Sequence, residues 1–239
     1  SCDPCRSRMG TSTRFSRTAH SAAARPFRTT QMYDIFDGMG AVWGQQYGLE
    51  VPNYFALPGE PRYEEPTFRR SNAWEATRQE VFAVREAVGI NEVQNFGKFR
   101  VAGPRARAWL DRIMAGAIPQ KGRLSLTPML SPKGKIIGDL TITCITETEF
   151  QVTGSYGAQD QHLRWFQKNL DPGVTVENMS DRITGFQIAG PNARELLSRL
   201  TRTDVSAEAF KFMDAKRMSL GLVDCLVQRV SYTGDLGYE

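Results

Sequence analysis

The sequence predicts an α+β fold in which antiparallel sheets pack against a few helices. Two observations support this prediction: most of the chain beyond residue 99 has strand-like patterns, and one strand–turn–helix unit occurs twice. The 239 residues, 41% hydrophobic and 23% charged, are ordinary for a globular chain and suffice for one large domain or two small ones. No apolar run reaches 18 residues, so we expect no transmembrane helix and no membrane partner.

The duplicated unit is the most informative internal signal. FRVAGPRARAWLDRI (residues 99–113) returns as FQIAGPNARELLSRL (residues 186–200), with roughly half of the positions identical. Each copy predicts a short strand, a Gly-Pro turn and an amphipathic helix, because proline fits the first turn of a helix, where its missing N–H costs nothing. The alternative is a chance match between two ordinary units.

The remaining strands are predicted from β-branched or alternating segments. The turn Ser131–Gly134 joins 125–130 to the next segment and predicts a hairpin. The strand segments are 135–145, 149–154, 174–180 and 222–234.

Helices are predicted at three places besides the first copy of the repeat. Asn72 followed by Glu75 indicates a capping box at the start of a helix that ends at Gly89. Residues 158–170 and 190–200 are the other two helical segments.

The net charge of +4 comes from the first thirty residues, which hold six arginines and one acid. The rest of the chain has 24 basic and 25 acidic residues, which argues against a nucleic-acid partner. The composition of this basic stretch resembles a mitochondrial transit peptide, although an arbitrary fragment start is equally compatible with it. We expect residues 1–31 to form a disordered tail.

Cysteine and histidine give no metal-site prediction. Cys2 and Cys5 form a lone C-x-x-C without a second close pair, and a zinc site needs about four ligands. The only histidines are His20, in the basic stretch, and His162, which we expect on the surface of a helix. We therefore predict no metal.

The chain resembles the aminomethyltransferase (glycine-cleavage T-protein) family over residues 32–239. The residues that carry this resemblance are the repeat, the hairpin and the ending RVSYTGDLGYE (229–239). The segments 40–56, 81–90, 95–104 and 126–142 are closer to the branch that is fused to dimethylglycine and sarcosine dehydrogenases. The resemblance implies the T-protein folate-binding fold over residues 72–239, truncated at its C-terminus, after a junction segment (32–71) that resembles the end of an amine-oxidase domain.

By resemblance, the catalytic carboxylate is Asp139 in the strand after the hairpin. Its implied role is proton transfer near N10 of tetrahydrofolate as a one-carbon unit moves, which a carboxylate within hydrogen-bond reach can perform. The alternative is an Asp on an edge strand or bulge that faces solvent, because aspartate is depleted in strands.

The resemblance also implies residues that bind the cofactor tetrahydrofolate. Glu239 would accept hydrogen bonds from the pterin ring, with Tyr232 in the same Y-T-G-x-x-G-x-E motif. Phe150 and Val152 would supply an aromatic ring and a backbone carbonyl beside the pterin. The alternative for the motif is a glycine-rich turn that ends in a surface glutamate.

No G-x-G-x-x-G follows an early strand, so we expect no dinucleotide-binding domain in this chain. FAD would belong to a missing N-terminal oxidase domain of the same parent chain.

The expected function is capture of an amine-derived one-carbon unit as methylene-tetrahydrofolate, in a parent that is an enzyme. The alternatives are a stand-alone aminomethyltransferase and a folate-binding module without catalysis. The expected location is cytoplasmic in a bacterium and the mitochondrial matrix in a eukaryote.

Overall fold

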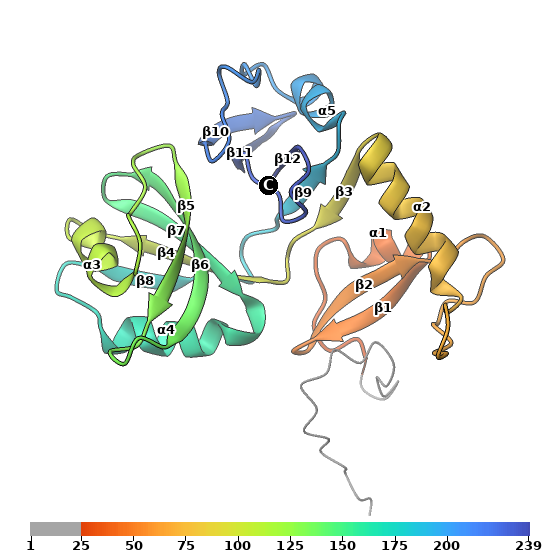
Figure 1. The fold of residues 1–239 in the computed structure, drawn as a ribbon, viewed down its shortest axis with the longest axis horizontal. Helices are drawn as coiled ribbons and strands as arrows, with labels where there is room; N and C mark the ends of the chain where they lie inside the picture. Colours follow the sequence, from red (N-terminus) through yellow and green to blue (C-terminus); the bar gives the residue numbers. More distant parts are fainter. Residues whose placement is uncertain (1–24) are drawn as a thin grey trace, which may run out of the picture.

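The computed structural model describes residues 25–239, and Cys2, Cys5 and His20 lie outside that range. Figure 1 shows three groups of elements around the C-terminal residue. The first group contains α1 (Tyr33–Gly38), β1 (Ala41–Gln46), β2 (Leu49–Phe55) and α2 (Ala73–Glu86). The second contains β4 (Phe96–Ala102), α3 (Ala106–Ile113), β5 (Leu124–Leu130), β6 (Ile136–Thr146), β7 (Glu149–Ser155), η1 (Tyr156–Ala158), α4 (Gln159–Lys168) and β8 (Thr175–Asn178).

The third group contains β3 (Gly89–Glu92), β9 (Phe186–Ala189), α5 (Ala193–Leu200), β10 (Ala215–Leu220), β11 (Val223–Gln228) and β12 (Gly237–Tyr238). Every pairing between these named strands is antiparallel. The sheets have the orders β1-β2, β10-β11, β12-β9-β3 and β5-β6-β7-β4-β8. The predicted α+β class with antiparallel sheets and few helices is confirmed.

The five-stranded sheet holds the largest core. Phe99, Leu140 and Val152 of the sheet pack with Trp109 of α3 and Phe166 of α4, and all five side chains are fully buried. Because neighbouring residues of a strand point to opposite faces, the alternate residues of β4, β6 and β7 form a second face that these helices do not cover. That second face is polar, and its Thr143 donates a hydrogen bond to Gln228 of the third group.

The predicted repeat has the expected elements in both copies. The strands β4 and β9 are each followed by a Gly-Pro turn and a helix, α3 or α5. Gly103 and Gly190 have nearly the same backbone conformation, with φ of +133° and +129°, which side chains rarely adopt. Ala106 and Ala193 donate equivalent backbone hydrogen bonds to these glycines.

The predicted hairpin is also present. Ser131 and Lys135 close the turn through a backbone hydrogen bond of 2.8 Å, and Gly134 has a φ of +70°. The segment 222–234, in contrast, is strand only as far as Gln228, and residues 229–236 form a loop before β12. The prediction of a strand up to 234 is wrong because Gly234 (φ +81°) sits in a turn.

The predicted capping box at Asn72 is wrong, although α2 does begin at Ala73. The Asn72 side chain accepts a hydrogen bond from the Glu65 backbone and donates one to the Tyr63 carbonyl, so it holds the preceding loop. Ser71 Oγ accepts the bond from the Ala73 N–H instead.

His162 is buried, and the prediction of a surface position is wrong. Its Nε2 lies 3.2 Å from the Ile137 carbonyl oxygen, and burial lowers the pKa of the imidazole. Gly138 and Gly154 make the room for this ring, because a Cβ at Gly138 would lie 2.6 Å from His162 Nε2.

Residues 25–31, the last part of the predicted disordered tail, have a defined conformation and contact residues of all three groups of elements. Arg25 forms an ion pair with Glu50, and Arg28 forms a parallel bridge with Leu49. The Arg28 guanidinium also donates to the Tyr156 hydroxyl, and Thr30 Oγ1 donates to Glu92. These contacts explain why the composition of this part misleads: its polar groups find specific partners.

Candidate functional site

The polar face of the five-stranded sheet is built by strand register. Thr141 pairs with Thr153, and Thr153 pairs with Lys98, so β6, β7 and β4 contribute one row of polar residues. The next row along the sheet contains Thr143, Gln151 and Arg100. Directly opposed residues of an antiparallel sheet share a face, so these six side chains belong to one surface.

Asp139 lies on the same surface, two residues before Thr141 on β6. It is opposite Pro128, and its side chain is exposed. Within residues 25–239 its carboxylate has no hydrogen bond or ion pair, so it remains available to a ligand on this face. The outward direction follows from the strand itself, because its neighbours Gly138 and Leu140 are buried on the core side.

Glu239 approaches this surface from the third group of elements. Its backbone exchanges two hydrogen bonds with Gln228 at the end of β11, with N···O distances of 2.7 and 2.9 Å. The Gln228 side chain in turn accepts a hydrogen bond from Thr143 Oγ1 at 3.3 Å. The backbone of Glu239 is thus tied through one residue to the surface that carries Asp139, and Figure 1 shows the chain end at the centre.

Gln187 is the neighbour of Glu239 across the small sheet. Tyr238 pairs with Ile188, so continuing the register places Glu239 opposite Gln187. The Gln187 side chain is buried, and its Nε2 has no hydrogen-bond partner in the described part of the chain. A buried donor without a partner costs free energy, which makes this amide a candidate contact for a polar ligand.

Burial raises the pKa of the Glu239 carboxyl group, and the positive charge of Lys98 opposes that rise. Lys98 is 4% exposed, and desolvation lowers the pKa of its ammonium group to about 8. Asp181, Glu92 and Glu239, in that order, oppose this decrease. Lys98 is therefore a buried cation on which the carboxylates of Asp181, Glu92 and Glu239 act from outside the five-stranded sheet.

Phe150 and Val152 do not lie on this surface. Both side chains point to the core side of the sheet, where they are fully buried in the main hydrophobic cluster. Val152 pairs with Phe99 and with Ile142, so strands flank its backbone on both sides. A ligand on the polar face would meet their neighbours Gln151 and Thr153 instead, because successive side chains alternate.

Tyr232 lies in the loop between β11 and β12 and is 84% exposed. Ser231 Oγ donates to the Asp235 carbonyl and closes this loop beneath it. The structure therefore places Tyr232 on the same chain segment as Glu239 but does not pack it against the polar face.

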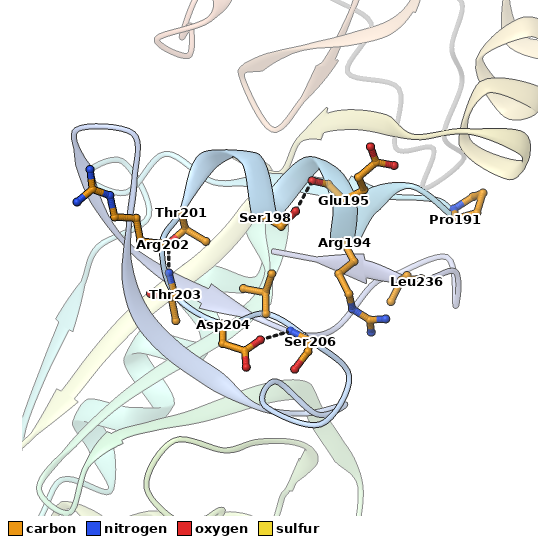
Figure 2. A pocket seen from close by; sticks show the side chains of 11 residues that line it. Pro191, Arg194, Glu195, Ser198, Thr201, Arg202, Thr203, Asp204, Ser206 and Leu236 are labelled. Carbon is orange, nitrogen blue, oxygen red and sulfur yellow. Dashed lines mark hydrogen bonds between the residues drawn. The ribbon is translucent and has the colours of Figure 1, made fainter.

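A shallow groove of about 670 Å³ lies elsewhere, along α5 and the loop that follows it (Figure 2). Its lining includes Arg194, Ser198, Arg202 and Asp204, and none of Asp139, Lys98 or Glu239 belongs to it. Its charges are of both signs, so it favours no single class of ligand.

Among residues 25–239, no helix is long and apolar enough to span a bilayer. No three His, Cys, Asp or Glu side chains of that range are grouped as metal ligands would be.

The sequence did not single out Lys98, Gln187 or Gln228. Lys98 and Arg100 alternate with apolar residues in the same way, so the pattern gives no sign that one is buried and the other exposed. Gln187 stands between two apolar residues just as the equivalent Arg100 does, so its burial has no signal in the pattern either.

Comparison with known proteins agrees with this architecture. Residues 32–239 match the model of the GCVT N-terminal domain. Mitochondrial dimethylglycine dehydrogenase from Homo sapiens is 33% identical over 221 residues, which are 91% of this chain and 25% of that protein. An aminomethyltransferase from Desulforamulus reducens is 29% identical over 160 residues, 66% of this chain and 43% of that protein.

A solved structure shares the fold. The glycine cleavage system aminomethyltransferase T from Bartonella henselae superposes with a TM-score of 0.69 at 19% identity, covering 89% of this chain and 52% of that one. The chain spans about a quarter of the length of the dehydrogenase relative and less than half of the aminomethyltransferase relative. From the match over residues 32–239, we conclude that the chain belongs to the GCVT N-terminal domain family.

Proposed function

We propose that this chain is the tetrahydrofolate-binding, one-carbon-transfer domain of a dimethylglycine or sarcosine dehydrogenase-like protein. The observation that carries the proposal is that the Glu239 backbone is joined through Gln228 to Thr143, on the polar sheet face that also carries Asp139. The 33% identity to human dimethylglycine dehydrogenase over 91% of the chain supports the fused branch, although an aminomethyltransferase from Bacillus subtilis reaches 31% over 89% of the chain. In such a protein an FAD-dependent oxidase domain would release the one-carbon unit that this domain captures.

The residues present fit the pterin end of a folate. The pterin ring offers a 2-amino group and an N3–H as adjacent donors, and the half-buried Glu239 carboxylate can accept both. Hydrogen bonds to a charged group are stronger than neutral ones and fix the orientation of a ring. Gln187 Nε2, which lacks a partner among residues 25–239, can donate to a ring acceptor beside it.

Asp139 is the group suited to the chemistry. Bound tetrahydrofolate supplies a weakly basic nitrogen that takes up the one-carbon unit. Asp139, exposed and free of partners in the described part, can accept the proton that leaves this nitrogen and pass it to solvent. Its negative charge also favours cationic character in the group being transferred.

The first prediction is that Asp139→Asn reduces one-carbon transfer by about 10²–10⁴-fold, the usual contribution of general acid–base catalysis. Asparagine keeps the shape and an acceptor oxygen, so folate affinity should change little. In a parent protein with an active flavin domain, the ratio of formaldehyde to methylene-tetrahydrofolate should rise. Asp111→Asn, which alters an exposed carboxylate on α3, is the matched control and should leave the ratio unchanged. An unchanged ratio in Asp139→Asn at saturating folate would show that Asp139 is a structural strand residue.

The second candidate is a stand-alone aminomethyltransferase, which the relatives of that name favour. The two candidates differ in the donor of the one-carbon unit. Transfer from a protein-bound aminomethyl carrier, with no response to an amine oxidase, would support the second candidate. Folate binding without either reaction would support a non-catalytic binding module.

A further inference from the structure

The strand that carries Asp139 contains a β-bulge two residues before it. The register of β6 against β5 shifts between Ile136 and Gly138, so Ile137 is an extra residue that no residue of β5 opposes. A bulge bends its strand, leaves the extra residue outside the ladder and changes the direction of nearby side chains. The position of Asp139 therefore depends on what holds Ile137 in place.

The sheet gives this end of β6 few hydrogen bonds. The pairing of β6 with β7 starts at Thr141, so within the described residues Asp139 has β5 alone as a neighbouring strand. The residue of β5 opposite Asp139 is Pro128, which has no N–H group to donate. The Pro128 carbonyl accepts from the Ala115 N–H at 2.8 Å and so points away from β6. The pair Asp139–Pro128 is therefore held only through its neighbours in the ladder.

His162 of α4 holds the bulge residue, because its Nε2 lies 3.2 Å from the Ile137 carbonyl oxygen. Burial lowers the pKa of the imidazole, so the ring is neutral at neutral pH. A carbonyl oxygen can only accept, so Nε2 carries the proton and Nδ1 is the unprotonated nitrogen. This Nδ1 is buried and has no hydrogen-bond partner among residues 25–239. Such an acceptor costs free energy that an apolar side chain would avoid, so packing alone does not account for a histidine here.

Two glycines let the imidazole ring lie against the backbone beside Asp139. A Cβ on Gly138 would lie 2.6 Å from His162 Nε2, and a Cβ on Gly154 would lie 3.5 Å from His162 Nδ1. The ring therefore lies on the core side of β6, against the residue that precedes Asp139. Asp139 points to the opposite, polar face, so His162 does not touch a ligand there.

We propose that His162 is a positioning residue for one-carbon transfer: its Nε2–H binds the carbonyl of the bulge residue Ile137 and so fixes Asp139 on the polar face. This inference rests on the proposed function. Proton transfer needs a carboxylate within hydrogen-bond reach of the reacting nitrogen. A displacement of about 1 Å can lower a rate about 100-fold, so a bulge that is free to shift would impair transfer without removing Asp139.

The second prediction tests this with two substitutions of His162 in a parent protein with an active flavin domain. His162→Met keeps a similar volume but removes the donor, and should lower the rate of one-carbon transfer about tenfold to a hundredfold at saturating folate. The KM for folate should change little, because the ligand does not contact His162. His162→Gln should restore most of the rate, since its amide N–H can take the place of Nε2 and donate to the Ile137 carbonyl.

A double variant separates positioning from a general loss of structure. If His162 acts through Asp139, His162→Met should cause no further loss of transfer in an Asp139→Asn background. The matched control is Phe166→Leu, one turn further along α4. Phe166 is fully buried against Phe99 and Trp109, so this change destabilises the same helix without touching the bulge. Its transfer rate should equal that of the unmodified parent.

Gly138→Ala applies the same test from the other side of the contact. The new Cβ would displace the ring from the Ile137 carbonyl, and Gly138 does not have a positive φ, so alanine adds no backbone strain of that kind. We expect the loss of transfer seen in His162→Met, and no further loss when the two changes are combined. This variant replaces His162→Met if the latter fails to fold.

Nuclear magnetic resonance of the chain gives a readout that needs no folate. Long-range ¹H–¹⁵N correlation at neutral pH should show the Nε2–H tautomer of His162. The Gly138 amide shares a peptide group with the Ile137 carbonyl, so its signal should shift more in His162→Met than in His162→Gln. An Nδ1–H tautomer overturns the proposal.

The outcomes separate the two proposals. An unchanged rate of transfer in Asp139→Asn contradicts the proposed function. When Asp139→Asn is impaired, three results overturn the role of His162 alone: a normal rate in His162→Met, an equal loss in Phe166→Leu, or a further loss in the double variant.

Discussion

The two copies of the repeat share their local geometry but differ in what surrounds them. In the first copy, Phe99 is fully buried in a five-stranded sheet, whereas the equivalent Phe186 of the second copy is 39% exposed in a three-stranded sheet. The helix differs in the same way: Ile113 ends α3 at 9% exposure, and Leu200 ends α5 at 46%. The first copy therefore builds a core, and the second supplies an open edge where β12 and Glu239 are added.

This difference shows what a strand–turn–helix unit needs from its sequence. The glycine of the Gly-Pro turn is the same in both copies, Gly103 in the first and Gly190 in the second. In each copy another backbone segment passes too close to this turn for a side chain to fit. Positions that decide burial are free to differ, because the number of neighbouring strands decides how much of each face is covered. The proposed site lies between the copies, at the surface that neither core occupies.

The third prediction tests the largest difference between the two copies, which is the burial of their first phenylalanine. Phe99→Ala should destabilise the chain by about 3–5 kcal/mol, the usual cost of removing a fully buried phenylalanine. Phe186→Ala should cost about 1 kcal/mol, because a large part of its ring already meets solvent. Urea denaturation followed by circular dichroism measures both free energies of unfolding. Equal losses would show that the two copies are energetically alike despite their surroundings.

The fourth prediction tests what the copies have in common. Gly103→Ala and Gly190→Ala should each cost about 1–3 kcal/mol from backbone strain alone, since φ is near +130° in both. Collision adds to this: the new Cβ would lie 2.1 Å from the Gly173 carbonyl oxygen in the first copy, and 2.5 Å from the Ala87 and Val84 carbonyl oxygens in the second. We expect the first variant to lose more.

The control for these variants is Gly134→Ala in the hairpin turn. Gly134 has a φ of +70° but nothing within 4 Å of the new Cβ, so only the strain of a left-handed residue remains, about 1–2 kcal/mol. If the control costs as much as Gly103→Ala in the same urea titration, close packing at the Gly-Pro turn is not what the repeat conserves.

The fifth prediction has the smallest expected effect. It compares the contacts of one equivalent arginine in the two copies, near the proposed site. Arg194 Nε donates to the Tyr238 hydroxyl at 3.1 Å, whereas the equivalent Arg107 contacts Cys144 Sγ at 3.2 Å and Glu147 at 3.2 Å. Tyr238→Phe should therefore cost about 1 kcal/mol, the typical net value of one hydrogen bond. Hydrogen exchange of the β12 amides should detect the loosening, and no change there would mean that the Arg194 bond contributes nothing.

The sequence was sufficient for elements whose signals are local. The Gly-Pro turns, the Ser131–Gly134 hairpin and the strand of Asp139 all depend on residues close together in the chain, and each formed where expected. The outward direction of Asp139 is equally local, because its neighbours alternate between buried and exposed sides. The resemblance to the T-protein family then placed Asp139 and Glu239 in a single hypothesis.

The tertiary structure decided the rest, because it depends on segments far apart in the chain. The segment of Phe150 to Thr153 alternates in a way that suits either face, and only the packing of α3 and α4 shows that Gln151 and Thr153 face the site. Lys98 and Arg100 have the same local pattern, yet the two crossings at 93–95 and 179–185 bury one of them. Whether a charge is buried depends on which distant segment covers it, and no local pattern contains that information.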